Sequence, residues 1–183
     1  MKTLATFLFT LFFTFSFFAQ NKRSSYMQLN FSTPLRGTWD SNDDSDYLFL
    51  PDGLSVKFGG GLHYNKQLAV GINTGIDWIA TEKLVVVPVF GNLKLSTKID
   101  PEMFLFLQGG YGKSIAIGRG SLTGDYTKIG LGLEDIEGLG LFTEFTQYGF
   151  SLHSPEKIWS ISFGISFTFF TKPIANPAPV PAP

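Results

Sequence analysis

Six charged side chains stand out because they occur inside segments of otherwise alternating apolar residues. They are three lysines and three carboxylates: Lys57, Lys94, Lys128, Asp77, Glu134 and Glu144. Isolated charges are costly to remove from water, so such groups must pair with one another or stay hydrated. Their chemistry is therefore salt bridging, a polar relay or a path for small solutes, and the elements that carry them decide between these.

A second candidate site is the acidic stretch "DSNDDSD". Its oxygen-bearing residues alternate as in a calcium-binding loop, at Asp40, Asn42, Asp44 and Asp46. The helix-loop-helix calcium pattern requires glycine at position six and glutamate at position twelve, where this chain has Ser45 and Pro51. We expect a solvated anionic loop, and calcium bridging by these four residues remains the alternative.

The segments that carry the six charges are predicted strands. Alternating stretches are separated by turn-forming sequences such as "NKQ", "TKIDP", "GRGSLTG" and "DIEG". No segment shows a convincing apolar stripe of helical period. The sequence predicts eight strands, at residues 25–35, 54–64, 68–79, 84–96, 102–115, 125–134, 139–149 and 157–170.

Each predicted strand has one large apolar face and one face rich in glycine, serine, asparagine and threonine. On a soluble barrel a solvent-exposed polar face would carry many lysines and glutamates, yet charged residues make up only 16% of the chain. Small polar residues suit the interior of an eight-stranded barrel, which side chains just fill. We therefore predict an all-β, eight-stranded antiparallel transmembrane barrel, with Tyr64, Trp78, Tyr111 and Trp159 near strand ends. A soluble barrel or sandwich is the alternative.

The two ends of the chain differ from the barrel in composition. Lys2 followed by an apolar run up to "FFAQ" predicts a signal peptide at 1–19 and export. The barrel is then expected at 20–171, and a disordered proline- and alanine-rich periplasmic tail at 172–183. The chain has no cysteine and a net charge of −1, which exclude disulfides, thiolate metal sites and an electrostatic footprint for nucleic acid.

The hairpin around "NKQ" gives one prediction of side-chain proximity. If 65–67 form a three-residue turn, Lys57 lies opposite Gly75 and diagonal to Asp77. Balanced charges in a narrow interior favour a salt-bridged, closed barrel over a pore. A polar relay or small-solute path is the alternative.

At this point the sequence resembles the small outer-membrane barrels of the OmpA/OmpX type. The segment "VVPVFGNLKLS" is similar to a strand common among their relatives. The last strand resembles the signal that the barrel-assembly machinery reads, at Ser162, Gly164, Phe167 and Phe169. The resemblance implies an outer-membrane location and contacts with outer-membrane lipid and lipopolysaccharide. In the family the chain usually ends at the aromatic residue, whereas here "TKPIANPAPVPAP" follows, which leaves open a protein partner for the tail.

The resemblance also raises an enzymatic alternative, because some eight-stranded barrels modify lipid A. The deacylase pattern places histidine and serine two residues apart on one strand face, whereas His153 and Ser154 are adjacent and Glu156 follows. His63 is expected to be a hydrogen-bonding residue of the lumen. The sequence thus predicts a closed, non-enzymatic envelope barrel without a cofactor; a lipid A-modifying enzyme and a minor channel are the alternatives.

Overall fold

The computed structural model of the chain describes residues 24–37, 49–117, 122–150 and 158–171, and all nine of their regular elements are strands. In chain order these are β1 (Ser24–Gly37), β2 (Phe49–Pro51), β3 (Gly53–Tyr64), β4 (Leu68–Ile79), β5 (Leu84–Asp100), β6 (Met103–Ile117), β7 (Thr123–Asp135), β8 (Leu139–Tyr148) and β9 (Ile158–Phe170). Within these ranges, no helix is long and apolar enough to cross a membrane. The eight predicted strands are all present.

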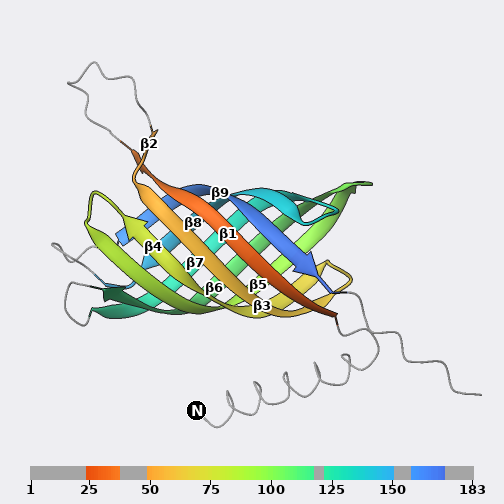
Figure 1. Cartoon of the computed structure of the whole chain (residues 1–183), viewed down its shortest axis with the longest axis horizontal. Coiled ribbons are helices and arrows are strands. Elements are labelled where there is room, and N and C mark those ends of the chain that lie inside the picture. The colour runs from red at the N-terminus through yellow and green to blue at the C-terminus, as the bar shows by residue number, and fades with distance from the viewer. Residues whose placement is uncertain (1–23, 38–48, 118–121, 151–157, 172–183) are drawn as a thin grey trace, which may run out of the picture.

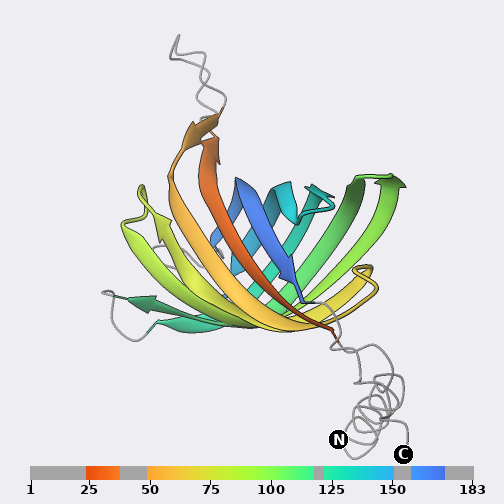
Figure 2. The ribbon, with the colours of Figure 1, turned by 45° about the vertical axis from the view of Figure 1, so that its right-hand side comes forward.

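Eight of the strands close into an antiparallel barrel (Figure 1). Each pairs with its neighbours in the order β1-β3-β4-β5-β6-β7-β8-β9, and β9 pairs back with β1 from Tyr26↔Phe170 to Leu35↔Ile161. The short β2 pairs only with the end of β1, at Leu35–Gly37, and extends that strand beyond the barrel (Figure 2). The prediction of an all-β, eight-stranded antiparallel barrel is confirmed.

The register around the barrel sets how strongly the strands tilt. Pairing leads from Ser25 through Leu62, Val70, Leu93, Gly109, Ile129, Phe145 and Ile161 back to Leu35. The path returns to β1 ten residues further on (35 − 25 = 10), which is the shear of the barrel. Strands tilted in this way enclose an interior that side chains can fill.

Burial alternates along the strands as the pleat requires. Residues such as Met27 and Ile72 on the outer face are 69% and 70% exposed, whereas their neighbours Gln28 and Asn73 are buried. The outer face is the apolar one, as a membrane-spanning barrel needs. The interior differs from the prediction of small residues in one respect, because it also holds large aromatic side chains: Tyr26, Phe90, Phe106, Tyr126, Phe142 and Tyr148.

The barrel has two distinct ends. At the turn end, tight turns at 65–67, 101–102 and 136–138 connect the strands, and β1 begins beside the end of β9. At the loop end lie β2 and the turn at 80–83. Tyr64 is at the turn end, and Trp78 and Trp159 are at the loop end, as expected. Tyr111 was wrongly expected near a strand end, since it lies within the central part of β6.

Candidate functional site

The lumen brings four of the charged residues into one group, which we call the four-residue network: Lys57, Asp77, Lys128 and Glu144. The Lys57 ammonium lies 2.5 Å from one oxygen of Glu144 and 3.3 Å from Asp77. The other Glu144 oxygen lies 2.6 Å from Lys128 Nζ. Lys57 on β3 and Glu144 on β8 belong to strands that are not neighbours, so this ion pair crosses the lumen.

Neutral side chains satisfy the carboxylates of the four-residue network further. Ser55 Oγ donates to one Asp77 oxygen at 2.5 Å, and the Tyr148 hydroxyl donates to the other at 2.7 Å. Thr146 Oγ1 donates to Glu144 at 3.1 Å. Hydrogen bonds to charged groups are stronger than those between neutral groups. They offset part of the cost of removing these carboxylates from water.

The remaining two charges form a separate ion pair nearer the turn end, which we call the two-residue pair: Lys94 on β5 and Glu134 on β7. Their charged atoms are 2.5 Å apart, and both side chains are almost completely buried. Thr168 Oγ1 donates to Glu134 at 2.7 Å and accepts from Lys94 at 3.3 Å. The charges of the two-residue pair are thus balanced within the pair itself.

Each buried lysine also lies over the face of an aromatic ring. Lys94 is 4.4 Å from the centre of Phe106, Lys128 is 5.1 Å from Phe90, and Lys57 is 5.9 Å from Tyr126. Cation–π contacts of this length stabilise a desolvated ammonium group. The sequence analysis missed these aromatic partners, although they share the strand parity of the lysines.

A layer of carboxamides lies between the two charged groups. Its members are buried side chains of four strands: Gln28 on β1, Asn73 on β4, Asn92 on β5 and Gln108 on β6. On β5, Asn92 is the inward-facing residue between Phe90 and Lys94. Among the described residues, the carboxamide atoms of Gln28, Asn30, Asn73 and Gln108 have no hydrogen-bond partner. Buried amides normally form hydrogen bonds, either to protein groups or to ordered water.

Side-chain contacts also occur at both ends of the barrel. At the loop end, Ile79, Leu84, Val86, Ala116, Phe150 and three aromatic residues form one apolar cluster. At the turn end, Lys66 Nζ donates to the carbonyl of Ile136 at 3.1 Å and lies 5.0 Å from the ring centre of Phe170. The polar layers therefore lie between an apolar cluster and a lysine–aromatic contact.

The charged side chains of the described part of the lumen are arranged as ion pairs. Each lumen carboxylate has a lysine within ion-pair distance. No group of three or more metal-ligating side chains occurs in the part of the chain that the structure describes. His63 packs edge-on against Phe170, with ring centres 4.7 Å apart, and its Nδ1 accepts from the Lys66 amide at 3.3 Å.

The other predicted site residues fall into two groups. Asp40, Asn42, Asp44 and Asp46, together with His153, Ser154 and Glu156, lie outside the described residues, as do segments 1–19 and 172–183. The four residues of the assembly pattern lie on β9, where Ser162 and Gly164 pair with Pro34 and Ser32 of β1, and Phe167 and Phe169 pair with Leu29 and Met27. The register also places Lys57 opposite Gly75, with Tyr64 opposite Leu68 across the turn.

No family model and no curated protein matches the sequence. Solved structures do match. Neisserial surface protein A has a TM-score of 0.56 at 11% identity, over 79% of this chain and 97% of that one. The outer membrane enzyme PagL has a TM-score of 0.49 at 14% identity, over 79% of this chain and 99% of that one. The Yersinia pestis outer membrane protein Ail has a TM-score of 0.48 at 12% identity, over 80% of this chain and 99% of that one. The chain has the fold of the small eight-stranded outer-membrane barrels, and at these identities the likeness concerns the fold alone.

Proposed function

We propose that this protein is an outer-membrane barrel with a closed lumen that acts in envelope structure or surface interaction and is not an enzyme. The observation that carries this proposal is that all six buried charges are paired within the lumen. Hydrated ions need a continuous polar path, whereas here an apolar cluster fills the loop end. In this proposal the turn end faces the periplasm and the loop end faces the exterior.

Conductance in a planar lipid bilayer tests the closed lumen. We expect the purified, folded protein to give no steady single-channel currents under conditions in which a general porin conducts. Large and steady currents would overturn the proposal of a closed barrel. Folding of the sample is checked by the shift in electrophoretic mobility between heated and unheated protein.

The carboxamide layer favours one second candidate, a minor path for small solutes. Its amides are candidate hydrogen-bonding groups for water or a small polar solute, because buried amides normally form hydrogen bonds. A liposome-swelling assay with small sugars distinguishes the candidates. We expect swelling no faster than that of protein-free liposomes, and faster swelling that Asn73→Leu abolishes would establish the path.

A lipid A-modifying activity through His153, Ser154 and Glu156 is the enzymatic alternative. Mass spectrometry of lipid A from cells with and without the protein tests it, and we expect identical spectra. Loss or gain of an acyl chain that depends on His153 would overturn the non-enzymatic proposal.

We also propose two protein partners. The barrel-assembly machinery reads Ser162, Gly164, Phe167 and Phe169 on β9, the strand whose pairing with β1 closes the barrel. A periplasmic or outer-membrane protein binds the tail that follows Thr171. Thr171 itself lies beside β1, where its amide donates to the Ser25 carbonyl at 2.9 Å. Affinity purification from solubilised outer membrane, with and without residues 172–183, tests the tail. A partner that still co-purifies with the truncated protein would contradict a role of the tail in binding it.

A further inference from the structure

At the turn end of the barrel, the side chain of Lys66 lies across the entrance to the lumen. Lys66 belongs to the turn between β3 and β4, and its Nζ donates to the carbonyl of Ile136, in the turn between β7 and β8, at 3.1 Å. These two hairpins are on opposite sides of the barrel, because two strands separate them in either direction, β5 and β6 or β9 and β1. We call this side chain the Lys66 bar.

The backbone of this turn indicates that the lysine is present for its side chain. The Gln67 amide donates to the Tyr64 carbonyl at 2.9 Å, and the two residues between them, Asn65 and Lys66, have φ angles of 50° and 60°. Asparagine tolerates this left-handed region, whereas the second position of such a turn is usually glycine. Residues held in sparsely populated backbone regions occur mostly at functional sites. The turn alone therefore does not explain the lysine.

The imidazole of His63 supports the Lys66 bar at two points. Its Nδ1 accepts from the Lys66 backbone amide at 3.3 Å, so the proton of the neutral ring is on Nε2. The same imidazole packs edge-on against Phe170 with ring centres 4.7 Å apart, and Lys66 Nζ lies 5.0 Å from the centre of the Phe170 ring. The imidazole and the ammonium group thus share one aromatic ring.

Protonation of His63 disrupts both contacts. Both nitrogens of an imidazolium are donors, so Nδ1 would no longer accept from the Lys66 amide. The new positive charge would share the Phe170 ring with the Lys66 ammonium, and like charges repel. Histidine is the side chain whose charge ordinarily changes between about pH 5 and pH 8. The bar is therefore held in place at neutral pH and loses its support in mild acid.

The groups around His63 do not neutralise this charge. Ser24 and Ala69 pair with His63 on its two sides. Glu134 is already paired with Lys94 at 2.5 Å, and the Asp135 carboxylate accepts from the amides of Gly138 and Leu139 at 2.8 and 2.9 Å. The titratable groups near the entrance, on the elements that surround His63, are Tyr26, Lys66, Lys94, Lys98, Glu134, Asp135 and Glu137. Of these, Lys66 is the charged group that faces the imidazole.

We propose that His63 and Lys66 form an acid-responsive lid on the turn-end entrance of the lumen. With His63 neutral, the Lys66 bar rests on Phe170 and Ile136 and closes the entrance. With His63 charged, the bar moves away, and water and small polar solutes reach the two-residue pair. The apolar cluster at the loop end stays in place, so the lid controls entry from one end and gives no passage through the barrel. The inference goes beyond the proposed closed barrel and does not depend on where the protein resides.

A cysteine placed behind the Lys66 bar tests the lid, since the chain has no cysteine of its own. Ala69 is 3% exposed and pairs with His63 on one side and with Lys94 on the other, so Ala69→Cys reports access to the lumen. Intact mass follows its modification by methyl methanethiosulfonate in folded protein in detergent, at about pH 8 and about pH 5.5. The rate is divided by that of Glu102→Cys in the exposed β5–β6 turn, which corrects for the reactivity of the thiol. We expect this ratio to rise at least about tenfold at the lower pH, because the protonated fraction of a histidine rises by more than that over this range.

Two further variants, each combined with Ala69→Cys, separate the lid from a general effect of acid. His63→Asn keeps an acceptor oxygen near the position of Nδ1 but does not titrate, so its ratio should stay low at both pH values. Lys66→Met keeps the length of the side chain without the ammonium, so its ratio should be high at both. The shift in electrophoretic mobility between heated and unheated protein checks that each variant is folded. A pH-independent ratio in the parent protein, a rise that persists in His63→Asn, or a low ratio in Lys66→Met would each overturn the proposal.

Discussion

The four-residue network and the two-residue pair place charges in the same lumen in different ways. In the network, Glu144 serves two lysines at once, and Asp77 receives two hydroxyl donors as well as Lys57. In the pair, Lys94 and Glu134 have one charged partner each and share Thr168. Removing one member of the network leaves more charge unpaired, whereas the pair can be removed as a unit.

The largest expected effect follows replacement of the shared carboxylate. Glu144→Leu leaves Lys57 and Lys128 with Asp77 alone, and an uncompensated buried charge costs about 3–5 kcal/mol. We expect the free energy of unfolding, measured by urea titration in lipid vesicles, to fall by that amount. Thr143→Leu, the neighbouring lipid-facing residue, is the control and should change little. A loss no larger than in the control would contradict the network's importance.

A smaller effect is expected from the hydroxyl donors to Asp77. Tyr148→Phe removes one hydrogen bond to a buried carboxylate and should reduce the free energy of unfolding by about 1.5–3 kcal/mol. Ser55→Ala removes the other and should cost a similar amount, since each serves a different Asp77 oxygen. The same urea titration measures both. If neither variant loses stability, these contacts do not support the network.

The smallest effect is expected where the two-residue pair is replaced as a whole. Lys94→Met/Glu134→Leu should lie within about 1 kcal/mol of the wild type, because a buried pair exchanged for apolar residues is often neutral or stabilising. Each single substitution should cost about 3–5 kcal/mol, so the double-mutant cycle should show strong coupling. Additive losses in the double variant would mean that the two residues act independently.

The alternation of apolar and polar residues predicted most of the fold, because the pleat of a strand turns successive side chains to opposite faces. Alternation assigned the six charges to the inner face, and the "NKQ" turn was sufficient to place Lys57 opposite Gly75. The same parity rule also applies to Phe90 and Tyr126, which the sequence analysis did not assign to the interior. Their large side chains conflicted with an interior expected to hold small residues.

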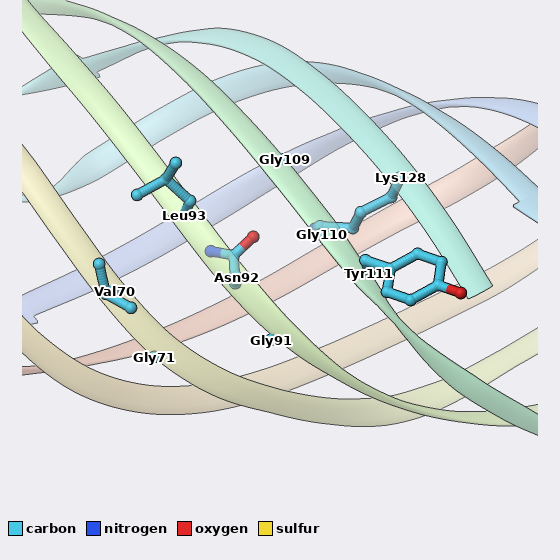
Figure 3. A pocket seen from close by; sticks show the side chains of 9 residues that line it. All are labelled: Val70, Gly71, Gly91, Asn92, Leu93, Gly109, Gly110, Tyr111 and Lys128. Carbon is cyan, nitrogen blue, oxygen red and sulfur yellow. The ribbon is translucent and has the colours of Figure 1, made fainter. Parts of the chain in front are cut away.

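What the sequence alone determined is which residues lie in strands and which face each one occupies. Only the closed barrel decided which residues meet across the lumen, since Lys57 and Glu144 are 87 positions apart on strands that are not neighbours. The contact depends on the registers of all eight strands together, which add up to a shear of ten. The β5–β6 register likewise makes Gly91 and Gly109 diagonal neighbours, because Gly91 pairs with Tyr111 and Gly109 pairs with Leu93 (Figure 3). Period-two alternation is a local property of the pleat, whereas contacts across a barrel depend on closure.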